Sequence, residues 1–340
     1  MMMQDGGTVD VRPDPDPGRA APEHSGAYLA TGLCLTLYGC AMLAWTAYGI
    51  SQGDGSAWDF VEGLFNPGAS SAAQVLGPYE WAFMVAFLAV AGLCLAQRRV
   101  ARSAALLCGF FLLAVSLREG IGLFDAAYRD QYSNDPLGGW VLATRGLGLM
   151  TALVVLASLV PATERRSGPA AAPEAPEARW RRLSRICGVL FLITAVARIG
   201  WTVRDLASSG LDAARYLRGV VDGSVMGTLD LSASTEFITA VSVLGLLVLG
   251  VTAFRGNRDI RGALLVFAAV ELYVTVRTVV WLTVTDFFNL ASETPEGALS
   301  MASTAYALAA MTSVVVLATG RGVGPYGVRT SVGSRVTTSE

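Results

Sequence analysis

Apolar stretches long enough to cross a lipid bilayer recur along the chain, with short polar segments between them. A membrane helix needs about 20 consecutive, mostly apolar residues to cross roughly 30 Å of hydrocarbon. The stretches that meet this requirement are 27–50, 79–97, 102–124, 139–161, 183–206, 234–254, 262–285 and 299–319. None of them is long enough to hold two helices. The pattern therefore predicts an all-α membrane protein with eight transmembrane helices.

Arginine gathers in every second connection and in the last segment, whereas the remaining connections are acidic. The arginine-rich group comprises Arg98, Arg99, Arg102, Arg165, Arg166, Arg179, Arg181, Arg182, Arg185, Arg255, Arg258, Arg261, Arg321, Arg329 and Arg335. Basic residues of membrane proteins are retained on the cytoplasmic side. The distribution thus predicts a multi-pass plasma-membrane protein with both termini in the cytoplasm.

The segments outside the apolar stretches divide the chain into two similar halves. Residues 1–26 and 321–340 have the composition of disordered cytoplasmic tails, and residues 162–182 that of a flexible, Pro- and Ala-rich cytoplasmic linker. This leaves 27–161 and 183–320 as two transmembrane units.

The two units also match in sequence. Positions 32–99 align with 188–255 without a gap, and the match continues beyond them with small shifts. The alignment pairs Trp45 with Trp201, Glu80 with Glu236, and Arg118 with Arg277. Charged and aromatic residues coincide at membrane positions by chance far less often than apolar ones do. Since each unit holds four helices, an even number, we expect two parallel four-helix repeats.

Composition excludes several kinds of chemistry. Apolar residues make up 53% of the chain and the mean hydropathy is +0.50. All 25 basic residues are arginine, which we interpret as a bias of a GC-rich bacterial gene, and the net charge of −2 indicates no nucleic-acid partner. A single histidine, no lysine and no C-x-x-C motif leave no basis for a bis-histidine haem, a His-ligated zinc or a Schiff base. We expect no cofactor and no metal.

Charged residues inside the apolar stretches are costly and need a partner or water. Arg118 lies 16 residues after Arg102, or about 24 Å along a helix, which places it in the outer third of the bilayer. Glu80 begins its stretch from the outside and lies at a similar depth. We therefore expect the repeated ion pairs Glu80–Arg118 and Glu236–Arg277. They are either clamps that fix helix register or the lining of an outward-facing cavity.

Four other charges have no counterpart in the opposite unit and are the candidate ligand-binding residues. They are Arg198, Glu271, Arg145 and Glu119. Arginines near one depth favour an anionic group, which guanidinium binds in a bidentate manner. Glu271, close to the expected bilayer centre, is either functional or a neutral, hydrogen-bonded carboxylic acid.

Aromatic residues mark the outer ends of the units. Trp45 and Trp201 are interpreted as interfacial anchors, and Trp201 is alternatively placed to stack on Arg198, three residues earlier. The external loops 51–78 and 207–233 each contain a short amphipathic segment, "WDFVEGLF" and "ARYLRGVV". Each segment predicts an interfacial helix that covers the bundle or closes an outer cavity.

Three functional classes remain open. We favour an outward-facing polar site that binds a small anionic or amphiphilic molecule or a lipid head group in transport. One alternative is a membrane-embedded enzyme that performs acid–base, cyclase- or isomerase-like chemistry on a lipid or isoprenoid. The other is a membrane scaffold or accessory subunit. The sequence identifies neither protein partners nor an oligomeric state.

Overall fold

The computed structural model describes residues 18–52, 57–66, 76–162, 175–210, 212–226, 231–256, 260–291 and 293–320. Its long helices are α1 (Ser25–Gln52), α3 (Pro78–Leu95), α4 (Val100–Gly122), α6 (Gly138–Leu159), α7 (Ala175–Ser209), α9 (Thr235–Arg255), α10 (Arg261–Val284) and α12 (Pro295–Thr319). Eight helices are long and apolar enough to cross a membrane. The predicted spans are therefore confirmed. The largest difference is that α7 begins inside the expected linker, at Ala175.

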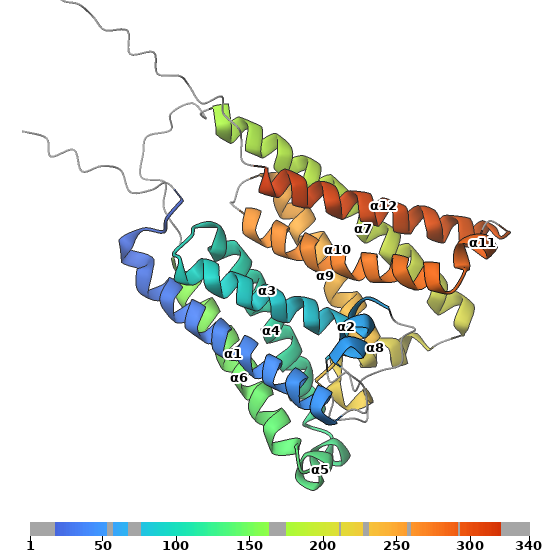
Figure 1. Cartoon of the computed structure of the whole chain (residues 1–340), viewed down its shortest axis with the longest axis horizontal. Helices are drawn as coiled ribbons and strands as arrows, with labels where there is room; N and C mark the ends of the chain where they lie inside the picture. The colour runs from blue at the N-terminus through green and yellow to red at the C-terminus, as the bar shows by residue number, and fades with distance from the viewer. Residues whose placement is uncertain are drawn as a thin grey trace, which may run out of the picture.

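Short helices occupy the connections at one end of the bundle (Figure 1). They are α2 (Ala57–Phe65), α5 (Ala126–Asn134), α8 (Ala213–Val221), the 3-10 helix η2 (Gly223–Met226) and α11 (Phe287–Ala291). We call this the short-helix end. The opposite, arginine end holds Arg98, Arg102 and Arg261, together with the 3-10 helix η1 (Pro22–His24). Helices α2 and α8 were predicted, whereas α5 and α11 were not.

Local sequence signals explain where several of these helices begin. The side chains of Asp125, Asp212 and Ser234 accept hydrogen bonds from backbone N–H groups in the first turns of α5, α8 and α9. Such caps satisfy donors that have no partner within a helix. Pro78 is the first residue of α3, where a backbone N–H would have no hydrogen-bond partner within the helix, so proline loses no bond there.

The long helices form two groups of four, α1, α3, α4 and α6 in one and α7, α9, α10 and α12 in the other (Figure 1). In both groups the first helix packs on the second and fourth, and the third packs on the fourth. The groups meet where α10 packs on α4 and α3. Gly262 permits this approach, because a Cβ atom there would lie 2.0 Å from the carbonyl oxygen of Val100.

Aromatic packing fills the interior of each group. Phe83 of α3 stacks on Phe111 of α4 with ring centroids 3.9 Å apart, and Phe191 of α7 meets Phe267 of α10 edge to face. Large apolar side chains such as Leu33, Phe110 and Leu244 are exposed on the outside of the bundle. An apolar exterior over helices of this length is typical of a protein surrounded by lipid.

Two arginines at the arginine end bind equivalent helix ends. The Nε atom of Arg102 donates to the carbonyl oxygen of Leu159 at the end of α6, over 3.1 Å. The Nε atom of Arg261 donates to the carbonyl oxygen of Ala318 at the end of α12, over 2.5 Å. A cation at a helix C-terminus satisfies unpaired carbonyl groups and interacts favourably with the helix dipole.

Candidate functional site

A partly buried ion pair joins the unrepeated residues Arg198 and Glu271. The guanidinium of Arg198, on α7, donates to the Glu271 carboxylate on α10 and to the Ser242 hydroxyl on α9. Ser242 Oγ in turn donates to Glu271 Oε1 over 2.7 Å, and Tyr79 Oη lies 3.5 Å from the same oxygen. Glu271 is 0% exposed. Its charge is therefore compensated at close range, as an enclosed carboxylate requires.

A second buried cluster surrounds Glu119 on α4. Its Oε1 lies 3.5 Å from Nη1 of Arg118 and 3.7 Å from Nη2 of Arg145, which comes from α6. Its Oε2 accepts hydrogen bonds from Tyr128 over 3.0 Å and from Tyr132 over 3.4 Å, both on α5. We call these five residues the Glu119 cluster. Two guanidinium groups share one carboxylate here, so the positive charge of the cluster exceeds the negative.

Residues of the first four-helix group also hold the segment that leads into α9. Arg145 Nη2 donates to the carbonyl oxygen of Leu231 over 3.1 Å. Glu80 Oε1 accepts a hydrogen bond from the backbone N–H of Ala233 over 2.8 Å. Both side chains are buried. The two groups of helices are thus joined by charged side chains near the short-helix end as well as by apolar packing.

The expected pairs Glu80–Arg118 and Glu236–Arg277 do not form between these residues. Arg118 pairs with the adjacent Glu119 and places its guanidinium 5.3 Å from the Phe237 ring centroid. The Glu80 carboxylate instead accepts a hydrogen bond from the backbone N–H of Ala233. Equal depth in the bundle, on which the prediction relied, does not determine which way a side chain points around its helix.

Glu236 and Arg277 are both half-buried, and neither forms an ion pair within the part of the chain that the structure describes. Glu236 lies beside Gly219 of α8.

Trp45 and Trp201 make equivalent hydrogen bonds. Trp45 Nε1 donates to Thr144 Oγ1 over 2.9 Å and links α1 to α6. Trp201 Nε1 donates to Ser303 Oγ over 3.2 Å and links α7 to α12. The guanidinium of Arg204, not that of Arg198, lies over the Trp201 ring at 5.0 Å from its centroid. Both tryptophans therefore tie the first helix of a group to its fourth.

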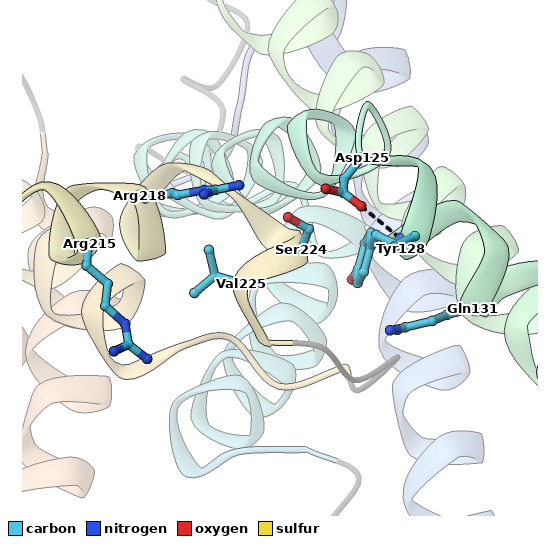
Figure 2. A pocket seen from close by; sticks show the side chains of 8 residues that line it. Asp125, Tyr128, Gln131, Arg215, Arg218, Ser224 and Val225 are labelled. Atoms are coloured by element: carbon cyan, nitrogen blue, oxygen red, sulfur yellow. Dashed lines mark hydrogen bonds between the residues drawn. The ribbon is translucent and has the colours of Figure 1, made fainter.

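An open groove of about 500 Å³ lies between parts of the two helix groups and shares Tyr128 with the Glu119 cluster (Figure 2). Its lining residues are Asp125, Ala127, Tyr128, Gln131, Arg215, Arg218, Ser224 and Val225. One wall is α5 and the residue before it, the other is α8, and η2 lies between them. We call this the anion groove, because of the arginines on its α8 wall.

Arginines dominate the α8 wall of the anion groove. Arg215 is exposed and forms no ion pair with another described residue, and Arg218 lies 3.5 Å from Asp222. Burial raises the pKa of Asp222, but hydrogen bonds from Ser224 and the interaction with Arg218 outweigh this effect, so the pKa is lowered overall. Asp222 thus remains ionised and fixes η2 through Ser224, over 3.0 Å to the backbone N–H and 2.7 Å to the hydroxyl.

Tyr128 connects the anion groove to the Glu119 cluster. Its ring lines the groove, and its hydroxyl donates to Glu119. Burial, followed by the Glu119 charge, raises the pKa of Tyr128 far above the ordinary value, so the phenol keeps its proton. The end of α4 lies close beneath η2, where a Cβ atom on Gly122 would be 2.8 Å from the Ser224 nitrogen. Only a residue without a side chain fits there.

Three of the four candidate ligand-binding residues lie in buried contacts, and Arg198 is partly exposed at 28% of its side chain. Arg215, Arg218 and Tyr128 were not predicted as site residues from the sequence. A signal for them existed, because "DAARYLRGVV" begins with a helix-capping aspartate and places two arginines three residues apart on one helical face.

In comparisons with known proteins, no protein-family model, curated protein or solved structure matches the chain. Among the described residues, no group of three or more His, Cys, Asp or Glu side chains could hold a metal ion. Function must therefore be inferred from the geometry alone.

Proposed function

We propose that the protein binds a small anionic molecule or an anionic lipid head group in the anion groove, and that this binding serves transport across the plasma membrane. One observation carries the proposal: Tyr128 lines the open groove and also hydrogen-bonds Glu119 in the charged cluster beneath it. One side chain thus links the surface groove to the charges inside the bundle.

The chemistry of the anion groove favours a carboxylate or a phosphate. Arg215 and Arg218 present guanidinium groups on one wall, and guanidinium binds both anions through paired N–H donors. Below them, Arg118 is 3% exposed, and its Nε and Nη2 atoms are buried with no hydrogen-bond partner in the described structure. Unsatisfied donors on a buried cation favour an additional anion or water nearby.

The position of the anion groove suits a transport mechanism in which a site opens alternately to the two sides of the membrane. One wall comes from the first helix group and the other from the second, so a rocking motion of the groups would change its width. We propose that the groups are two parallel four-helix repeats. The equivalent hydrogen bonds of Trp45 and Trp201, and those of Arg102 and Arg261, support this duplication. We further propose that the groove faces outward, because arginine is retained on the cytoplasmic side of membrane proteins.

A scaffold function is the second candidate, and the Arg198–Glu271 pair favours it. This pair is compensated within the bundle and joins three helices, as a purely structural clamp would. An enzyme fits less well. Of the three acids that could serve such chemistry, Glu271 and Glu80 are buried and give a substrate little access, and Glu236 is half-buried.

Flux measurements separate these functions. The purified full-length protein would be reconstituted into vesicles loaded with either phosphate or succinate, and anion release would be followed over time. We expect release above that of empty vesicles, and we expect Arg215→Gln/Arg218→Gln to lose most of it. Arg204→Gln is the matched control, since Arg204 contacts Glu296 and Trp201 away from the groove. Vesicles that release neither anion faster than protein-free ones would contradict transport of these anion classes.

A further inference from the structure

A second groove, of about 230 Å³, lies on the seam between the two helix groups. Its lining residues are Pro78 at the start of α3 and Val274, Arg277, Thr278 and Trp281 on α10. It shares no residue with the anion groove. The lining combines one cation with apolar and aromatic surface.

Arg277 is a charged side chain whose partner is missing from the described protein. It is half-buried and forms no ion pair, and its Nε atom is buried without a hydrogen-bond partner among the described residues. An arginine at membrane depth costs about 2.5–3.5 kcal/mol at the helix centre and less toward the interface. Such a residue is expected to hold a counter-charge, and the described part of the protein offers none here.

The position of Arg277 along α10, in the outer third of the expected bilayer, brings its side chain within reach of lipid head groups. It lies 16 residues after Arg261, which is at the arginine end, so the two are about 24 Å apart along the helix axis. Trp281 follows one turn later and is 43% exposed. Tryptophan is enriched at the membrane–water interface, and arginine side chains extend toward that interface.

We infer that this groove binds the phosphate of an anionic phospholipid in the leaflet at the short-helix end. The Arg277 guanidinium pairs with the phosphate, and Pro78, Val274 and Trp281 provide apolar surface for the glycerol backbone and the first part of an acyl chain. A lipid fits better than a soluble anion, because the apolar side chains of Trp281 and Val284, three residues apart on α10, are exposed beside the groove and offer surface for an acyl chain. This lipid site is independent of anion binding in the anion groove.

Native mass spectrometry of the full-length protein in detergent tests the inference, with phosphatidylglycerol and phosphatidylcholine as probes. We expect wild type to bind phosphatidylglycerol more tightly than phosphatidylcholine. Arg277→Gln should weaken phosphatidylglycerol binding by about tenfold, and Arg204→Gln should match wild type. Arg277→Lys should weaken it less than Arg277→Gln, because lysine keeps the charge but loses the paired donors. Equal phosphatidylglycerol binding by wild type and Arg277→Gln would overturn the inference. Displacement of the lipid by inorganic phosphate would overturn it too, in favour of a site for the soluble ion.

Two further variants localise the lipid to this groove. Thr278→Trp fills the groove from an exposed position, keeps Arg277, and should weaken phosphatidylglycerol binding even if Arg277→Gln fails to fold. Arg215→Gln/Arg218→Gln should keep the component of phosphatidylglycerol binding that Arg277→Gln removes, because the double variant alters only the anion groove. Loss of that same component in the double variant would place this lipid in the anion groove and overturn the assignment to Arg277.

Discussion

The Tyr128 hydroxyl donates a hydrogen bond to Glu119 Oε2 over 3.0 Å, and the same tyrosine ring forms part of the wall of an open groove. One side chain therefore belongs both to a surface site and to a buried cluster of charges. Because Glu119 also faces Arg118 and Arg145, a change at Tyr128 alters the balance of the whole cluster.

Replacement of Tyr128 by phenylalanine should destabilise the protein. The ring stays, but Glu119 loses its shorter tyrosine hydrogen bond. Hydrogen bonds to charged groups contribute about 1.5–3 kcal/mol. We expect a lower melting temperature in detergent at neutral pH. A melting temperature equal to that of wild type would mean that this hydrogen bond does not hold the cluster together.

The same variant should change how stability depends on alkaline pH. The pKa of Tyr128 is raised in the folded protein by burial and by the Glu119 charge. Its stabilising effect is therefore fully present below the ordinary tyrosine pKa of about 10 and is lost as the pH rises toward the raised value. Melting temperatures of wild type should fall more steeply above pH about 10 than those of Tyr128→Phe. Parallel curves would contradict the assignment.

Removal of one partner of the Arg198–Glu271 pair should be costly. An isolated charge left in an enclosed site destabilises a protein by about 3–5 kcal/mol. We expect Glu271→Gln, which leaves Arg198 partly exposed, to cost less than Arg198→Gln, which leaves the enclosed Glu271 carboxylate unpaired. Chemical unfolding of both variants measures this. The exposed Arg204–Glu296 contact is the control, and Arg204→Gln should cost less than about 1 kcal/mol.

The proposed duplication makes a prediction about the two tryptophans. Each indole N–H is bonded to a hydroxyl group on the fourth helix of its own group. Trp45→Phe and Trp201→Phe should therefore have similar effects, about 1 kcal/mol each from the lost hydrogen bond plus the loss of ring contacts. Thermal unfolding of the single variants tests the match. A large loss of stability in one variant and none in the other would mean that the two tryptophans do not stabilise their helix groups equally, contrary to the prediction.

Labelling of introduced cysteines tests the orientation. Ser133, on α5, and Arg98, in the connection between α3 and α4, are exposed at opposite ends of the bundle. We expect a membrane-impermeant maleimide to label Ser133→Cys in intact cells and Arg98→Cys only after the membrane is opened. The reverse pattern would place the anion groove in the cytoplasm. The wild-type protein, without an introduced cysteine, gives the background labelling, since its own five cysteines lie in long helices.

The sequence was sufficient for the long helices and insufficient for the contacts between them. Span lengths follow from the apolar stretches, because a bilayer imposes a fixed length on any helix that crosses it. Glu271 and Arg198 were singled out individually, since charges inside apolar stretches are conspicuous. Their pairing depends on where the fold sets α7 and α10, 73 residues apart in the chain, which no local pattern encodes.

The anion groove could not be predicted for a related reason. Its walls come from α5 and α8, which lie in different helix groups. Capping residues such as Asp125 and Asp212 predict that a helix starts, yet they carry no information about its neighbours. Tyr128 meets Glu119 only because the chain turns back between α4 and α5. A close approach through Gly122 then places η2 over both.

The most direct test of anion binding is the effect of an anion on the thermal stability of purified wild-type protein and of Arg215→Gln/Arg218→Gln. A ligand that binds only the folded state stabilises it by about 2.7 kcal/mol at a concentration 100 times its dissociation constant. We predict that phosphate or succinate raises the melting temperature of wild type and of Arg204→Gln but not that of the double variant, at constant ionic strength. An equal rise in all three proteins, or none in any, would contradict anion binding in this groove.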